Sequence, residues 1–183
     1  ICSTKRTPWS LTRANVFDKP LVKKFLTIIK MLPVYRFRDG FSTLRKNDEM
    51  MESCVNFLTS GESILIFGEG NHNDQYFLRP LQKGFARIAL AAEEKNDWKL
   101  GVKIVPVGLQ YDSHGDFRSR ALVSFGTPLV VNEILNSSKI TPDNIDILIK
   151  KTEAAFKPLM LQINTDHYDN RLAYLQAHRQ IKK

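Results

Sequence analysis

A glycine-rich segment at residues 67–73 holds the side chains best suited to chemistry in this sequence. It reads Phe-Gly-Glu-Gly-Asn-His-Asn, follows a hydrophobic run and precedes a helical pattern that begins near Lys83-Gly84. Ligands of open α/β sheets bind beyond the carboxyl ends of strands, and two glycines let the backbone approach a ligand closely. The same pattern also fits a plain turn. In the first interpretation, the crevice would be lined by Glu69, Gly70, Asn71 and His72.

Two further segments carry residue types that suit substrate binding. Residues 33–38 read Pro-Val-Tyr-Arg-Phe-Arg, and the guanidinium groups of Arg36 and Arg38 suit bidentate phosphate binding at a strand end. The alternative is that both are exposed charges at a sheet edge. Residues 105–108 read Val-Pro-Val-Gly. This small, apolar segment around Pro106 suits either the wall of a narrow pocket or a core strand with a bulge.

The elements that must position these residues alternate between strand and helix patterns, which predicts an α/β fold. Strands are expected at residues 9–13, 33–37, 63–67, 103–109 and 121–125. Helices are expected at residues 21–31 after a cap at Asp18, from a cap at Asn47 to Gly61, from Lys83-Gly84, from Thr141-Pro142 to Pro158, and in the tail from Asp166. We expect a mixed, mostly parallel central sheet flanked by helices, with a helical C-terminal tail.

Length and composition predict one globular domain over residues 1–183, with its core in 1–130 and a helical part in 131–183. No apolar run is long enough to span a bilayer, and the start shows no secretory signal pattern. Because the first residue is Ile1, we expect a fragment or a trimmed product. Cys2 and Cys54 do not make a disulfide framework, so a reduced compartment fits best, with Cys54 in the core.

The net charge of +8 is concentrated at one end of the chain. Residues 1–46 hold eleven Lys and Arg but two acids, which gives +9, whereas the other 137 residues carry −1. Such concentration indicates an anionic partner: a phosphorylated substrate, a lipid surface or nucleic acid. The alternative is a solvated basic face. Nucleic acid is the weakest of the partners, because no recognised nucleic-acid motif is present.

In this order and at these spacings, the three segments resemble the acyltransferase family that esterifies glycerol 3-phosphate and lysophosphatidate. That family has an arginine at a strand end, which Arg36 matches, and the block Phe-Pro-Glu-Gly-Thr-Arg-Ser, which residues 67–73 match in part. It also has a Val-Pro-Val/Ile strand, which residues 105–107 match, and a Lys-Gly like Lys83-Gly84. The likeness covers roughly residues 8–130.

This sequence departs from the family pattern in two places. The family's Pro, Thr, Arg and Ser of the glycine-rich block are replaced by Gly68, Asn71, His72 and Asn73, which removes a permanent phosphate-binding charge. Arg79, Lys83 or the arginines of residues 36–38 could replace it. The family's His-x4-Asp block is also missing, because none of the four histidines has an aspartate at that spacing. We expect this block upstream of residue 1, and this chain alone to be inactive.

The resemblance implies an acyl transfer without metal or cofactor, in which acyl-CoA or acyl carrier protein is the donor substrate. The missing histidine would act as general base for the hydroxyl of glycerol 3-phosphate or a lysophospholipid. Arg36 would hold the acceptor phosphate, while Glu69, Gly70, Asn71, His72 and Lys83 would shape its site and Pro106 would border a channel.

The implied location is the cytoplasmic side of a membrane, with the protein peripheral or anchored through other segments. An anionic membrane surface is the expected partner. Two alternatives stay open: a non-catalytic module that binds anionic lipid or nucleic acid through residues 1–46, and an acyltransferase for a different acceptor, such as a lyso-aminolipid.

Overall fold

The computed structural model describes residues 7–35, 42–70, 77–111, 120–135, 138–163 and 167–181. The first half contains β1 (Trp9–Arg13), η1 (Ala14–Phe17), α1 (Pro20–Ile28), β2 (Met31–Val34), α2 (Ser42–Thr59) and β3 (Ile64–Leu65). The second half contains α3 (Gly84–Lys95), β4 (Lys103–Ile104), β5 (Val107–Tyr111), β6 (Ala121–Phe125), β7 (Leu129–Val130), α4 (Val131–Ile134), α5 (Pro142–Phe156), η3 (Lys157–Leu159) and α6 (Tyr168–Ile181). The predicted α/β class with a C-terminal helix is confirmed.

Strand pairing divides into one parallel sheet and two antiparallel pairs. The parallel sheet has the order β2-β1-β3, with Leu11 opposite Leu32 and Ser10 opposite Leu65. The antiparallel pairs are β4 with β7 and β5 with β6. Parallel pairing among the described residues is therefore confined to the N-terminal half, which contains two of the three candidate segments.

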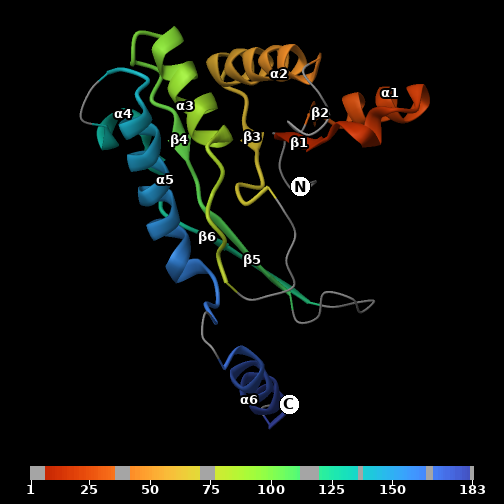
Figure 1. Cartoon of the computed structure of the whole chain (residues 1–183), viewed down its shortest axis with the longest axis vertical. Helices are drawn as coiled ribbons and strands as arrows, with labels where there is room; N and C mark the ends of the chain where they lie inside the picture. The colour runs from red at the N-terminus through yellow and green to blue at the C-terminus, as the bar shows by residue number, and fades with distance from the viewer. Residues whose placement is uncertain are drawn as a thin grey trace.

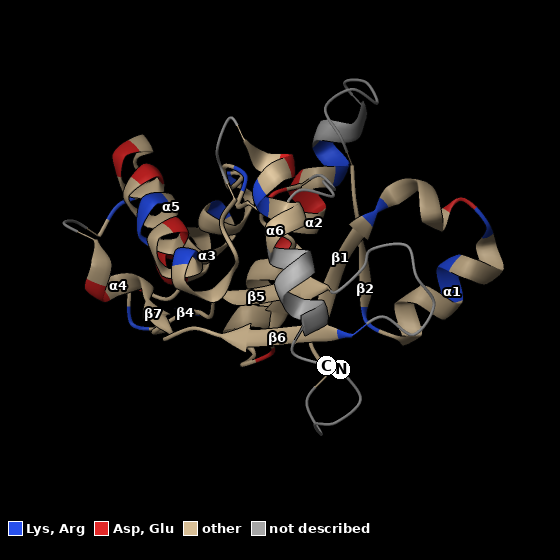
Figure 2. Ribbon diagram, turned by 90° about the horizontal axis from the view of Figure 1, so that it is seen from below, with Lys and Arg blue, Asp and Glu red and all other residues tan. Residues whose placement is uncertain are grey.

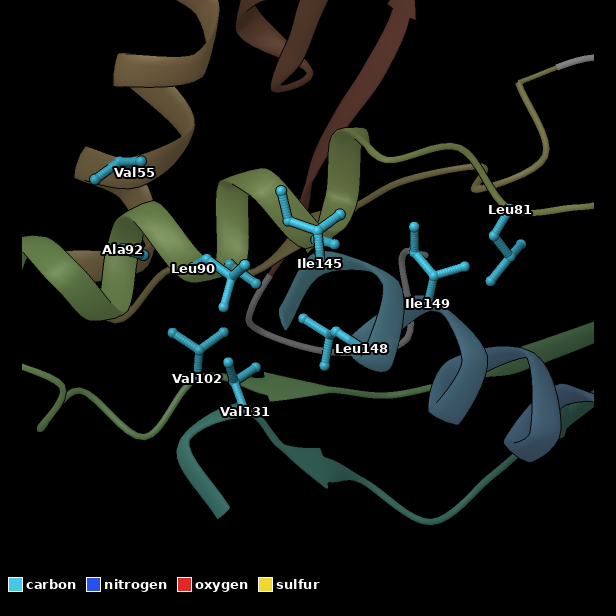
Figure 3. Packing of buried hydrophobic residues seen from close by; sticks show 11 residues of the cluster. Val55, Leu81, Leu90, Ala92, Val102, Val131, Ile145, Leu148 and Ile149 are labelled. Carbon is cyan, nitrogen blue, oxygen red and sulfur yellow. The ribbon is translucent and has the colours of Figure 1, made fainter. Parts of the chain in front are cut away.

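The hydrophobic core lies where α2, α3 and α5 meet β4 and α4 (Figure 1). Figure 3 shows Leu148 and Ile149 of α5 turned toward side chains of other elements, with Leu81 near Ile149. The buried cluster comprises Val55, Leu81, Ala86, Ala89, Leu90, Ala92, Val102, Val131, Ile145, Leu148 and Ile149. One core thus joins residues on both sides of position 130.

Several expected elements are confirmed where a local signal fixes them. Thr141 caps α5 by accepting a hydrogen bond from the Asn144 backbone N–H at 3.2 Å. Gly61, with φ of +77°, follows the end of α2 and donates to the Leu58 carbonyl. Cys54 is buried, and burial raises the pKa of its thiol to about 11.

Two predicted helix caps are wrong. The residue before α1 is Lys19 rather than Asp18, and it makes no side-chain cap bond. The second helix, α2, begins at Ser42, so Asn47 lies inside it instead of capping it. The Asn47 amide bonds the backbone of Tyr35, a partner that helix propensity does not reveal.

The expected strand at 103–109 is divided by Pro106. β4 pairs with β7, and β5 pairs with β6. Pro106 lies between the two segments, and its nitrogen carries no hydrogen to donate to a neighbouring strand. Proline predicted a bulge or an edge position here, and the observed feature is a break between two strand segments. Within the part of the chain that the structure describes, no helix is long and apolar enough to cross a membrane.

Candidate functional site

The glycine-rich segment leaves the parallel sheet at its carboxyl edge. Because β1, β2 and β3 run in the same direction, the segments that follow them leave at one edge of the sheet. The central strand β1 separates the segment after β2 from the segment after β3. Residues 66–70, after β3, and Tyr35, after β2, therefore lie on either side of the carboxyl end of β1.

Asn47 fixes the backbone where the chain leaves β2. Its side-chain oxygen accepts from the Tyr35 N–H at 3.0 Å, and its side-chain nitrogen donates to the Tyr35 carbonyl at 2.9 Å. The ammonium of Lys46 lies 5.2 Å from the centre of the Tyr35 ring. Arg36 and Arg38 follow directly but lie outside the described residues. The two bonds to Asn47 thus set the position from which the arginine segment departs.

The segment after β3 forms a tight turn at Gly68–Gly70. The Gly70 N–H donates to the Phe67 carbonyl at 3.1 Å, and Gly70 has φ of +66°, which favours glycine. A Cβ on Gly68 would lie 3.0 Å from Leu81 Cδ2. Glycine at position 68, where the family has proline, therefore leaves room for the buried Leu81 side chain.

Residues 78–83, called here the strap, run beside this turn and hold Glu69. The Arg79 N–H donates to Glu69 Oε2 at 3.3 Å, and the Gln82 N–H donates to the Gly68 carbonyl at 2.8 Å. Glu69 is half-buried, so one carboxylate oxygen is oriented by backbone while the group stays accessible from solvent. Such an arrangement can orient a hydroxyl or hold a cationic group beside the sheet edge.

Helix α5 in turn holds the strap. Glu153 Oε1 accepts from the Leu81 N–H at 3.0 Å, and Lys83 Nζ pairs with Asp146 Oδ1 at 3.2 Å. Both side chains of the Lys83–Asp146 pair are about half exposed, at 55% and 52%. The helix therefore supports the glycine turn indirectly, through the backbone of Leu81.

The predicted site residues divide into three groups. Glu69 and Gly70 lie in one turn, and the strap that carries Lys83 is bonded to it. Pro106 is buried and its carbonyl accepts from the Gly126 N–H at 2.8 Å, and among the described residues it makes no hydrogen bond to this turn. The third group lies outside the described residues: Arg36, Asn71 and His72.

The family assignment follows from a match to known proteins. A family model described as Acyltransferase matches residues 1–110, which is more than half of the 183 residues. The chain belongs to this acyltransferase family. The family expected from the ordered motifs is thereby confirmed.

Curated relatives of this acyltransferase chain come from yeasts. Glycerol-3-phosphate O-acyltransferase 2 of Saccharomyces cerevisiae is 33% identical over 138 residues, covering 74% of this chain and 18% of that protein. Glycerol-3-phosphate O-acyltransferase 1 of the same organism is 37% identical over 97 residues, covering 50% and 13%. The chain spans less than a fifth of the length of either relative. No solved structure matches the chain significantly.

The matched region of this acyltransferase contains the turn and the strap, but it does not contain the α5 residues that contact the strap. The match ends at residue 110, whereas Asp146 and Glu153 lie beyond it. Sequence reasoning missed Glu153, because it is 72 positions from Leu81 along the chain and stands in an ordinary amphipathic helix. It also missed the contact of Asn47 with Tyr35, and the only local hint was an amide side chain inside a helix.

Proposed function

We propose that the parent protein of this chain transfers a fatty acyl group from acyl-CoA or acyl carrier protein to glycerol 3-phosphate or a lysophospholipid such as lysophosphatidate. One observation carries the proposal: Glu69, in the matched family motif, is oriented by the Arg79 N–H at the carboxyl edge of the parallel sheet. The names of the two yeast relatives support the acceptor class.

The proposed roles follow the order of the motifs. Arg36 holds the acceptor phosphate, Glu69 and Gly70 shape the acceptor site beside it, and Pro106 borders a channel for substrate. The acceptor site also includes Asn71, His72 and Lys83. Lys83 is half exposed and already paired with Asp146, so it contributes positive charge near the strap rather than a buried contact.

The proposed general base is a histidine paired with an aspartate elsewhere in the parent protein. None of the four histidines of this chain is followed by an aspartate at the family spacing. The histidine takes the proton of the acceptor hydroxyl, and the hydroxyl oxygen attacks the thioester carbonyl. The thioester C–S bond then breaks, and the donor leaves as a thiol. We propose that the thioester is a substrate and that no separate cofactor or metal takes part.

The test measures acceptor-dependent thiol release by the full-length parent enzyme, with the chain alone as the inactive comparison. Arg36→Ala should raise the KM for the phosphorylated acceptor about tenfold or more, since a charge-assisted hydrogen bond contributes roughly 1.5–3 kcal/mol. Arg36→Lys should restore only part of it, because an ammonium lacks the bidentate fork. Equal effects on donor and acceptor, or none on either, would assign Arg36 a structural role. Thiol release by the chain alone would contradict the placement of the base.

A second candidate function, non-catalytic binding of anionic lipid, is favoured by helix α1, which exposes Lys23 and Lys24 together with the apolar side chains of Leu21, Phe25 and Ile28. An anionic membrane surface is a proposed partner under both functions, because a lysophospholipid acceptor also resides in a bilayer. The thiol-release assay on the full-length parent protein distinguishes the two functions, since a binding module releases no thiol at any protein concentration.

A further inference from the structure

Helix α1 presents an apolar face to solvent. Leu21 is 83% exposed, Phe25 is 61% exposed and Ile28 is 70% exposed. These residues are spaced by four and three positions, so they lie on one side of the helix. The sequence of α1 therefore places three large apolar side chains where a helix of a soluble domain normally carries polar ones.

This face is separate from the face that α1 uses in the fold. Leu26 is buried and Val22 is half-buried, and the helix contacts η1 and β2. Figures 1 and 2 both show α1 at the edge of the molecule, beyond β2 and away from α3 and α5. The outer face consequently has no covering element among the described residues.

Lys24 borders this outer face, Lys23 lies farther round the helix, and α1 itself contains no carboxylate. Lys19, Lys23 and Lys24 are all exposed, and residues 14–29 contain one acid, Asp18 (Figure 2). Lys24 is three positions from Leu21 and four from Ile28, so it neighbours both. An open depression beside the apolar side chains is lined by Pro20, Lys23, Lys24, Thr27 and Ile28.

We propose that the outer face of α1 docks on an anionic lipid surface. Leu21, Phe25 and Ile28 enter the boundary between headgroups and acyl chains, and the helix axis lies in the plane of the membrane. Lys24 extends its ammonium group to lipid phosphates from the side of the helix, and Lys23, which lies farther round the helix, adds positive charge near the membrane surface. This inference rests on the proposed membrane partner, not on acyl transfer.

Charge favours lipid over a second copy of the chain as the occupant. A symmetric dimer through this face would bring each lysine pair close to its equivalent on the other copy. Like charges facing one another disfavour that contact. In an anionic membrane, the headgroups instead complement the lysines, and the acyl-chain boundary accepts the apolar side chains in the same orientation of the helix.

The experiment measures co-sedimentation of this chain with phosphatidylcholine vesicles that contain or lack phosphatidylserine, at low and high salt. Leu21→Ser/Phe25→Ser should weaken binding to the anionic vesicles on the order of tenfold or more at both salt concentrations. Lys23→Gln/Lys24→Gln should weaken it about fivefold per lysine at low salt, with a much smaller effect at high salt. No acyl donor is present, so the outcome is independent of whether acyl transfer is demonstrated.

Matched controls come from exposed residues on other elements. Leu122→Ser/Phe125→Ser alters exposed apolar side chains of β6, and Lys150→Gln/Lys151→Gln alters an adjacent lysine pair of α5. Both should leave vesicle binding unchanged, and circular dichroism should show that every variant keeps the wild-type fold. The lysine pair of α1 tests the proposal even if the serine variant fails to fold.

Two results would overturn the proposal. The first is equal loss of vesicle binding in the α1 variants and in their matched controls, or no loss in either. The second is a wild-type chain that forms dimers in sedimentation velocity, with Leu21→Ser/Phe25→Ser abolishing the dimer but not vesicle binding. That outcome would make the outer face an interface between copies.

Discussion

Removing the Glu153 carboxylate should loosen the glycine turn from a distance. Glu153 Oε1 accepts from the Leu81 N–H at 3.0 Å, and Leu81 is 7% exposed. Glu153→Ala leaves this buried N–H without its partner, which costs about 1–3 kcal/mol of unfolding free energy. Glu153→Gln keeps an oxygen acceptor in place, so its cost should stay within about 0.5 kcal/mol.

A second contact between the strap and α5 supplies the comparison. The Lys83–Asp146 pair also joins the strap to α5, but both side chains are about half exposed. Exposed ion pairs contribute only about 0–1 kcal/mol. Asp146→Ala should therefore cost less than Glu153→Ala, although it removes the more strongly charged contact. Urea unfolding of the three variants gives the free energies directly.

Hydrogen exchange locates the effect within the fold. In Glu153→Ala the amides of Leu81 and Gln82 should exchange faster by about tenfold to a hundredfold, since 1.4 kcal/mol corresponds to tenfold. The Gln82 N–H bonds the Gly68 carbonyl, so the change should reach the turn. Equal free energies for Glu153→Ala and Glu153→Gln, or a larger loss in Asp146→Ala, would refute the reasoning. Unchanged exchange at Leu81 would do the same.

Two further predictions concern the packing of small and buried residues. Gly108→Ala should lower the free energy of unfolding by about 1–3 kcal/mol in urea, because the new Cβ would lie 2.5 Å from the Leu159 carbonyl oxygen. The control Gly84→Ala should be neutral or slightly stabilising, because its Cβ meets nothing within 4 Å. Cys54 should react with a thiol reagent far more slowly in the folded Cys2→Ser variant than in denaturant, since it is buried and its pKa is about 11. The folded thiol holds its proton above the unfolded value of 9.0, so stability attributable to Cys54 should fall as pH rises from about 9 to about 11. Fast native labelling, or a fall in stability between about pH 9 and pH 11 that is the same in wild type and Cys54→Ala, would contradict this assignment.

The sequence alone determined the elements whose signals are local. Thr141-Pro142 begins α5 because a hydroxyl cap and a fixed φ act within one turn of the helix. Gly61 follows α2 because glycine adopts positive φ without a steric penalty. The ordered motifs likewise identified the acyltransferase family, since residues 67–70 and 105–107 keep their types and spacing in any conformation.

Tertiary structure alone decided the contacts that join distant segments. Asn47 lies inside α2 instead of at its start, and its amide bonds the backbone of Tyr35, a partner that no local pattern encodes. Glu153 supports the turn at Gly68 only because α5 packs on the same core as Leu81. Similarly, β4 pairs with β7 across the intervening β5 and β6, and no local signal at residues 103–104 specifies that partner. These contacts are selected by the burial of side chains from many elements at once, so residue type and spacing along the chain do not determine them.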